Sequence, residues 1–269
     1  MKNNQKGTPP LITVAMPIYN AGEYLVDAVN SIIAQTYTNW ELYVIDDGST
    51  DNAIDPIKSI KDARIKILKD GLNKGLAARL NQAIDLAKGQ YFARMDQDDI
   101  SMPDRFKMQI DALEANSNLD LVATRALTIN SKNQIVGQLP FALNRQQICS
   151  KLWRGFYMPH PTWMGRLAWF KKYKYKVPQS YYSEDCELLL RSYESSHFDC
   201  LPEILLKYRI RDKINWKNQL KARRAVLKLQ ISHFYSQGQY LSMALSSLVF
   251  TLRVALDFLK VVKQLLSKV

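Results

Sequence analysis

Apolar runs and amphipathic segments alternate along roughly the first hundred residues. Four short apolar runs are typical of strands buried in a parallel sheet. Between them, residues 21–35 and 73–89 place apolar side chains at three- and four-residue steps, which predicts amphipathic helices. Strands that alternate with helices predict βαβ units and an α/β fold with a mostly parallel central sheet flanked by helices. The four predicted strands comprise residues 11–16, 40–46, 63–70 and 90–96.

The pattern changes after residue 102. A helix is expected to begin at Pro103, because proline is favoured at the first helical position. The following residues predict a strand and a hairpin, then a helix and a further strand, and finally a helical extension with a break at Gly238. We therefore expect one large domain over residues 1–212, with halves at 11–100 and 101–212, and a helical tail over 213–269. The predicted elements comprise residues 103–116, 119–141, 184–193, 203–210 and 215–269.

Charge changes this picture at the tail. The chain has a formal net charge of +12, and residues 214–269 contain nine Lys or Arg and one acid, a net charge of +8. A basic tail can bind nucleic acid or an anionic membrane surface, or it can be a solvated face. Few aromatic residues lie among these basic residues, which argues against nucleic acid. Leucines recur there at three- and four-residue steps, which suits either packing on the domain or an amphipathic helix at a membrane interface. These are Leu241, Leu245, Leu248, Leu252, Leu256 and Leu259.

Composition narrows the class and the compartment. The chain is 47% hydrophobic and 23% charged, which is typical of a globular protein. Three scattered cysteines without CxxC spacing argue against a disulfide framework or a zinc site and indicate a reducing compartment. No apolar run precedes the first predicted strand, so no signal peptide is expected, and no stretch is apolar enough to predict a membrane span.

Two acid clusters follow predicted strands. Asp46 and Asp47 come after the second, and Asp96, Asp98 and Asp99 come after the fourth. Ligands of parallel α/β sheets bind beyond the carboxyl ends of the strands, so both clusters are candidate site residues. The DxD spacing can present two carboxylates to Mg²⁺ or Mn²⁺, and a metal that also holds a diphosphate stabilises a leaving group. The alternative is a solvated turn that caps the next helix.

A third acidic pair stands alone in a basic stretch. Residues 121–183 contain no acid and ten Lys or Arg, and Glu184 and Asp185 follow at once. The pair is either favoured by the dipole of the helix that it opens or supplies a general base.

Six segments together resemble the family 2 glycosyltransferases, which have the GT-A fold. More narrowly, the chain is similar to the bacterial enzymes that build lipopolysaccharide, capsule or exopolysaccharide. The resemblance covers residues 12–212. The matching segments, in the order of the family, are VAMPIYNAGEYL, VIDDGSTD, NKGLAARLNQAIDLAKGQYFARMDQDDISMPDR, HPTWMGR, EDCELLLR and ILLKYRIRD.

The resemblance implies a reaction. A hexose would move from a nucleotide-diphosphate sugar, with UDP the most frequent nucleotide, to a hydroxyl of a cell-surface glycan or a lipid-linked acceptor, with inversion. The base would deprotonate that hydroxyl, which attacks the anomeric carbon as the nucleotide diphosphate leaves. A lipid-linked acceptor would place the protein in the cytoplasm, peripheral on the inner face of the membrane.

The resemblance also implies residue roles in the nucleotide-binding half and the acceptor half. Asp185 matches the catalytic base, and Asp96 and Asp98 match the DxD that binds ribose, metal and diphosphate. The cofactor would be Mn²⁺ or Mg²⁺. The other residues expected to bind the nucleotide sugar are Pro17, Tyr19, Asp46, Asp47, Arg191 and Arg211.

Two departures from the family pattern mark this chain. Arg211 stands where relatives often have a metal-ligating histidine, and an arginine can pair with phosphate but cannot ligate a metal. The segment before Glu184 lacks the GGY turn common in relatives, so an unusual loop is expected on the acceptor side. His160 matches a family HPT motif, and its alternative role is a hydrogen-bonded structural histidine.

Two other readings account for part of the sequence. A haloacid-dehalogenase-type phosphatase also has DxD after an apolar strand. That family, however, places Thr or Val where Ile100 stands and has its nucleophile near the N-terminus. A non-catalytic scaffold at a membrane surface would keep the fold and the basic tail without turnover.

Overall fold

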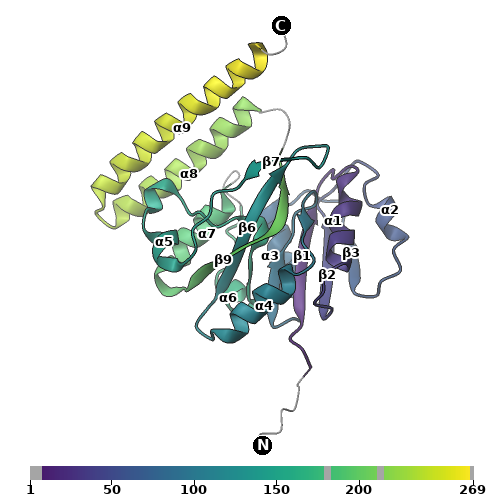
Figure 1. The fold of residues 1–269 in the computed structure, drawn as a ribbon. Coiled ribbons are helices and arrows are strands. Elements are labelled where there is room, and N and C mark those ends of the chain that lie inside the picture. The colour runs from purple at the N-terminus through teal and green to yellow at the C-terminus, as the bar shows by residue number, and fades with distance from the viewer. Residues whose placement is uncertain (1–7, 179–182, 211–214, 267–269) are drawn as a thin grey trace, which may run out of the picture.

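The structure is a computed structural model that describes residues 8–178, 183–210 and 215–266, with side chains described to residue 262 in the last segment. Its centre is one mixed sheet, nine-stranded over the described residues, with strand order β3-β2-β1-β4-β8-β6-β9-β5 and with β7 paired to β6 (Figure 1). The strands are β1 (Ile12–Ile18), β2 (Trp40–Asp46), β3 (Ile65–Lys69), β4 (Tyr91–Arg94), β5 (Ile100–Ser101), β6 (Leu121–Ile129), β7 (Ile135–Gln138), β8 (Met164–Arg166) and β9 (Phe198–Arg209).

Strands β1 to β4 form a parallel half of the sheet. β1 lies between β2 and β4 and runs parallel to both, and β2 runs parallel to β3. β8 pairs antiparallel with β4 and with β6, and β9 runs parallel to β6. The predicted α/β fold with a largely parallel centre is confirmed, and the antiparallel pairs all involve strands that follow the first hundred residues.

Helices cover both faces of the sheet, as the alternation of strand side chains requires. Helices α1 and α4 pack on one face through Leu25, Val29, Phe106 and Ile110. Helices α3, α6 and α7 pack on the other through Leu80, Phe170 and Leu189. The helices are α1 (Tyr24–Ile33), α2 (Asp55–Lys58), α3 (Leu76–Leu86), α4 (Arg105–Ala115), α5 (Arg145–Cys149), α6 (Leu167–Lys172), α7 (Glu184–Ser192), α8 (Trp216–Ser236) and α9 (Tyr240–Leu266), with short 3₁₀ turns η1 (Leu152–Arg154), η2 (His160–Thr162) and η3 (Tyr193–Ser195).

Two boundaries differ from the sequence expectation or refine it. Helix α4 begins at Arg105 rather than at Pro103, because Asp104 has non-helical dihedral angles. The break at Gly238 is confirmed, since α8 ends at Ser236 and Gly238 has φ +67°. The expected domain boundary at residue 212 lies outside the described residues.

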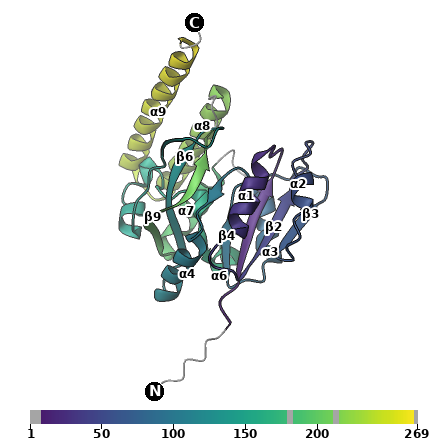
Figure 2. The same cartoon turned by 45° about the vertical axis from the view of Figure 1, so that its right-hand side comes forward.

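The helical extension is an antiparallel hairpin of α8 and α9 on one flank of the sheet, beside α5 and α7 (Figures 1 and 2). Three side chains tie it to the rest of the protein. Gln230 donates to the Leu152 carbonyl at 2.6 Å, Gln237 donates to Glu194 Oε1 at 3.0 Å, and Arg253 donates to the Arg154 carbonyl at 2.9 Å. No helix in the part of the chain that the structure describes is both long and apolar enough to cross a bilayer.

Candidate active site

The carboxyl ends of β1, β2 and β4 meet at one edge of the sheet, and both acid clusters lie there. Asp46 is the last residue of β2 and pairs in register with Ile18, the last residue of β1. Asp96 follows β4, which flanks β1 on its other side. The two clusters thus follow the strands on either side of β1, and Pro17 lies in the buried part of β1 between them.

The β2 cluster is held by a network within the chain. Asp47 accepts from the backbone N–H groups of Lys74 (2.7 Å) and Gly75 (3.0 Å) and from Arg79 Nε (2.9 Å). Arg79 is only 1% exposed and also pairs with Asp70, which holds the pKa of Asp70 well below its usual range. Asp47 is therefore rigid and already ionically paired, at the loop that leads into α3.

Asp46 is buried, and the turn after it requires a glycine. Asp46 Oδ1 accepts from Ser49 N–H at 2.9 Å, whereas Oδ2 has no hydrogen-bond partner and lies 3.4 Å from Lys69 Nζ. Gly48 has φ +77°, and a Cβ there would lie 3.0 Å from the Leu72 carbonyl carbon. A side chain at residue 48 would therefore crowd the backbone of Leu72, in the loop whose later residues Lys74 and Gly75 donate to Asp47.

The three acids after β4 have different surroundings. Asp99 is fully buried, its Oδ1 accepts from Arg209 N–H at 2.8 Å, and its Oδ2 has no hydrogen-bond partner. Burial raises the pKa of Asp99 well above its usual range, and the nearby Asp96 and Asp98 raise it further. Arg209 Nε also donates to the Asp98 carbonyl at 2.8 Å. Burial favours the neutral form of Asp99, which reduces the repulsion among the three acids. Arg209 of β9 holds the turn in place.

Asp96 is bound by an arginine two residues before it. Arg94 donates through Nε to Asp96 Oδ1 at 2.8 Å and through Nη2 to Oδ2 at 3.1 Å. Between the acids, the Gln97 side chain accepts from the Tyr19 N–H at 2.6 Å and donates to the Tyr19 carbonyl at 3.1 Å. The half-exposed Tyr19 is thus joined to the DxD turn.

The donor chemistry of this turn fits a hard divalent cation. Its side-chain oxygens are the type that Mg²⁺ and Mn²⁺ prefer, and Asp99 Oδ2 lacks a hydrogen-bond partner beside Asp96 and Asp98. Over the described residues, no three His, Cys, Asp or Glu side chains are grouped as a complete metal site. Mg²⁺ is usually bound by one or two carboxylates with water and substrate phosphates, so two aspartates suffice when a diphosphate is present.

The Glu184–Asp185 pair opens α7, and Arg94 links Glu184 to the DxD turn. Arg94 is 5% exposed and its Nη1 lies 3.8 Å from Glu184 Oε1. The same Nη1 contacts His160 Nδ1, and His160 Nε2 is 2.8 Å from the Tyr175 hydroxyl. His160 is therefore a buried, hydrogen-bonded histidine, as its structural alternative predicted.

Burial sets the protonation of the acidic pair. Burial, together with the smaller effect of the Asp185 charge, raises the pKa of Glu184 to about 7. Burial also raises the pKa of Asp185, against the hydrogen bond that Asp185 Oδ1 accepts from Cys186 N–H at 2.7 Å. Carboxylates whose pKa lies closer to neutrality are stronger bases than ordinary surface acids, which suits proton abstraction.

One predicted arginine, Arg191, is not brought into this arrangement. Arg191 pairs with Glu187 at 3.0 Å and donates to the Lys174 carbonyl at 2.7 Å. Arg211 lies outside the described residues. Sequence reasoning missed Arg94, Gln97 and Arg209, whose partners are up to 111 residues away. The only sequence signal was their position inside the quoted motifs.

Comparison with known proteins decides the family. The model of Glycosyl transferase family 2 matches residues 13–174. This chain belongs to the family 2 glycosyltransferases. A similar relative is the uncharacterized glycosyltransferase MJ1057 of Methanocaldococcus jannaschii, 31% identical over 79% of this chain and 75% of its own length. The family assignment displaces the phosphatase reading.

One further sequence relative and one solved structure are also similar to this family 2 chain. WfgD of Escherichia coli, named a UDP-Glc:alpha-D-GlcNAc-diphosphoundecaprenol beta-1,3-glucosyltransferase, is 38% identical over 48% of this chain and 50% of its own. The crystal structure of S. aureus TarS 1-349 with UDP-GlcNAc has a TM-score of 0.65 at 18% identity, over 82% of this chain and 66% of that one. That likeness confirms the GT-A fold, and the chain spans about two thirds of the TarS structure.

Proposed function

We propose that this family 2 glycosyltransferase moves a hexose from a UDP-sugar to an acceptor hydroxyl with inversion. The observation that carries the proposal is the convergence at one sheet edge of the Asp46–Asp47 turn, the DxD turn and, through Arg94, the Glu184–Asp185 pair. In this assignment Pro17, Tyr19 and Asp47 contact the nucleoside, with Asp46 beneath them. Arg191 and Arg211 remain predicted donor-binding residues.

Asp185 is the proposed base. Its raised pKa strengthens its oxygens as proton acceptors, and the bond from Cys186 N–H to Oδ1 fixes the direction of the carboxylate. Asp185 takes the proton of the acceptor hydroxyl as that oxygen bonds to the anomeric carbon and the bond to UDP breaks. The inverted product and UDP leave, and Asp185 returns the proton to solvent.

Asp98 and Asp96 are the residues that would hold a divalent cation. Bound there, Mn²⁺ or Mg²⁺ would supply positive charge for the diphosphate of the leaving UDP. Arg94 keeps Asp96 in place, and the buried Asp99 with Arg209 keeps the backbone of Asp98 in place.

The acceptor proposed is a hydroxyl of a lipid-linked or cell-surface glycan. The support is the printed activity of WfgD, whose acceptor is a diphosphoundecaprenol-linked sugar. Such an acceptor lies at the membrane, so the enzyme is proposed to work in the cytoplasm, peripheral on the inner face of the membrane.

A donor and acceptor panel tests the function. Purified protein with MnCl₂ is given UDP-glucose, UDP-galactose and UDP-GlcNAc, with and without a GlcNAc-diphospholipid acceptor, and UDP release is followed. We expect slow release from one donor, faster release with the acceptor, and an inverted anomeric configuration in the product by NMR. No UDP release above that of the Asp185→Asn variant with any donor would favour the scaffold reading.

A further inference from the structure

Helix α9 buries two polar side chains and exposes a row of leucines. Among the described side chains of α9, the two that are buried are polar, Ser246 at 1% exposure and Asp257 at 6%. Five leucines at three-, four- and seven-residue steps share the opposite face, with exposures from 55% to 75%, whereas Val249 and Phe250 line the cavity beside α8. The five are Leu241, Leu248, Leu252, Leu256 and Leu259. We call these five residues the outer face of α9.

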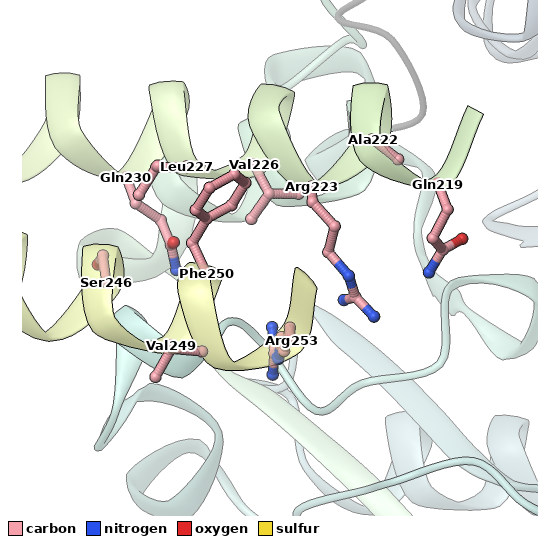
Figure 3. A pocket seen from close by; sticks show the side chains of 10 residues that line it. All are labelled: Gln219, Ala222, Arg223, Val226, Leu227, Gln230, Ser246, Val249, Phe250 and Arg253. Carbon is pink, nitrogen blue, oxygen red and sulfur yellow. The ribbon is translucent and has the colours of Figure 1, made fainter. Parts of the chain in front are cut away.

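The inner face of α9 is fixed by polar contacts. Asp257 pairs with Arg223 of α8 at 3.1 Å, and Arg253 donates to the Arg154 carbonyl of the globular part at 2.9 Å. A cavity of about 170 Å³ remains between α8 and α9, lined by residues that include Arg223, Phe250 and Arg253 (Figure 3). Rotation of α9 to bury the leucines would break both polar contacts, so the outer face stays exposed in the protein alone.

The basic residues of α8 point elsewhere. Lys217, Lys221, Arg224 and Lys228 are exposed and follow one another at three- and four-residue steps, so they share one face of α8. The α8 residues that face α9 are different ones, Gln219, Arg223, Val226 and Gln230 (Figure 3). The basic face of α8 and the outer face of α9 therefore lie on opposite sides of the hairpin, which the sequence pattern did not foresee.

We propose that the outer face of α9 inserts into the interface of an anionic lipid bilayer, and that apolar burial rather than the basic residues of α8 supplies most of the binding. The outer face exposes five leucines, and exposed leucines on one face are typical of interfacial helices. This deepens the proposed function, on which it rests for a lipid-linked acceptor, by naming the element that meets the membrane.

Charge decides between a bilayer and a second copy of this chain as the occupant. Helix α9 itself carries the basic residues Arg253, Lys260 and Lys263, and its one acid, Asp257, is buried in an ion pair. Two copies joined through the outer face would bring these like charges together without compensating acids, whereas an anionic headgroup layer attracts them. A leucine seam between helices would also need charged flanking positions of both signs to set its register.

Vesicle sedimentation tests the proposal without substrate. The full chain is mixed with phosphatidylglycerol-containing vesicles at about 0.1 M and about 0.5 M NaCl, which shortens the screening length to a few ångströms. We expect binding at both salt concentrations, with less than about a tenfold loss at high salt, because burial of apolar surface is not screened. The Leu248→Glu, Leu252→Glu double variant should bind at least about tenfold more weakly at both.

The matched control reverses charge on α8. Lys217→Glu with Lys228→Glu should change binding by less than about threefold, since those side chains face away from the outer face of α9. Both positions are exposed, as are Leu248 and Leu252, so circular dichroism and the Tm should match the wild type. Leu248→Ser with Leu252→Ser repeats the test without adding charge, should the glutamates disturb folding.

Three results would overturn the proposal. One is loss of binding in the lysine variant with retention in the leucine variants, which would make the contact electrostatic. Another is wild-type protein that does not sediment with the phosphatidylglycerol vesicles at either salt concentration. The third is a dimer by light scattering that the leucine variants dissolve, with no vesicle binding. UDP release from donor alone is measured in parallel, so failure of the membrane proposal leaves the catalytic one separately testable.

Discussion

At the carboxyl edge of β1, β2 and β4, charged side chains are buried, whereas on α9 leucines are exposed. Arg94, Asp99 and Arg79 are at most 5% exposed at that edge, and each charge lies against a named partner. On α9, the five leucines of the outer face are more than half exposed. Both regions reverse the usual distribution of polarity, but only the first is complete in one molecule. The sheet edge is thus a preorganised site, whereas the outer face of α9 is a surface that requires a binding partner.

The largest effect is expected from substitution of the proposed base, Asp185. Asp185→Asn cannot accept a proton, and we expect transfer to fall by roughly 10²–10⁴-fold, the usual contribution of a positioned base. Binding of UDP-sugar by calorimetry should be unchanged, because the proposed donor contacts lie at the ends of β1, β2 and β4. If Asp185→Asn turned over like the wild type, Glu184 would be the next candidate for the base, and Glu184→Gln would be the next variant to measure.

A smaller effect is expected at the DxD turn. Asp98→Asn removes a proposed metal ligand, and we expect UDP affinity in Mn²⁺ to fall by at least about 10–100-fold, the range seen when groups that support a metal site are lost. Titration of UDP with and without Mn²⁺ measures this, with the exposed Asp27→Asn on α1 as the matched control. An affinity that keeps its full Mn²⁺ dependence in the variant contradicts the assignment.

The pH dependence sharpens the role of burial at the edge. The base must be deprotonated, and burial raises the pKa of Asp185 and takes that of Glu184 to about 7. Activity should therefore fall about tenfold per pH unit on an acid limb whose midpoint lies above the value of about 4 for an ordinary aspartate. Glu184→Gln removes a neighbouring negative charge and should move the midpoint to lower pH. A pH–rate profile in overlapping buffers gives the midpoint for the wild type and for Glu184→Gln. Equal midpoints would mean that the charge of Glu184 does not affect the base.

The smallest effect concerns stability. Because the folded-state pKa of Asp99 is raised, its ionisation disfavours the folded state, and this loss of stability sets in as pH rises above about 4. Asp99→Asn keeps an oxygen for Arg209 N–H and cannot ionise. We expect its Tm to rise by about 2–4 °C at pH 7.5, the shift for about 1 kcal/mol in a chain of this size, and not to rise near pH 4. Thermal unfolding without metal measures this, with Asp111→Asn on the exposed side of α4 as control. A lower Tm at pH 7.5 would mean that the bond to Arg209 outweighs the ionisation cost.

Sequence alone could place the acids but not the groups that hold them. Asp46 and Asp96 end strands whose apolar runs are local signals, so the meeting of the two clusters followed from parallel topology. Arg94 and Arg209 act through partners far along the chain, and their neighbours in sequence do not reveal those partners. The metal, the individual residue roles and the division into domains stay predictions.

The orientation of the tail could not be read from its period. Leucines at three- and four-residue steps suit a buried face and an exposed face equally well. The discriminating residue was Asp257, a single acid among nine basic residues, whose pairing with Arg223 fixes which side of α9 turns inward. That pair joins positions 34 residues apart, so it is visible only once the hairpin is formed.

Arg94 contacts Asp96 of the DxD turn and Glu184 of the acidic pair, so a change at one of these acids affects the other. If a donor-bound cation draws Asp96 away from Arg94, more of the Arg94 charge faces Glu184, and a nearby positive charge favours ionised carboxylates. Donor binding and deprotonation of the pair then help each other by the same factor, as thermodynamic linkage requires. We expect the acid limb of kcat, which reports the loaded enzyme, to lie at lower pH than that of kcat/KM, which reports the free one. Coincident limbs would mean that the two halves of the site titrate independently.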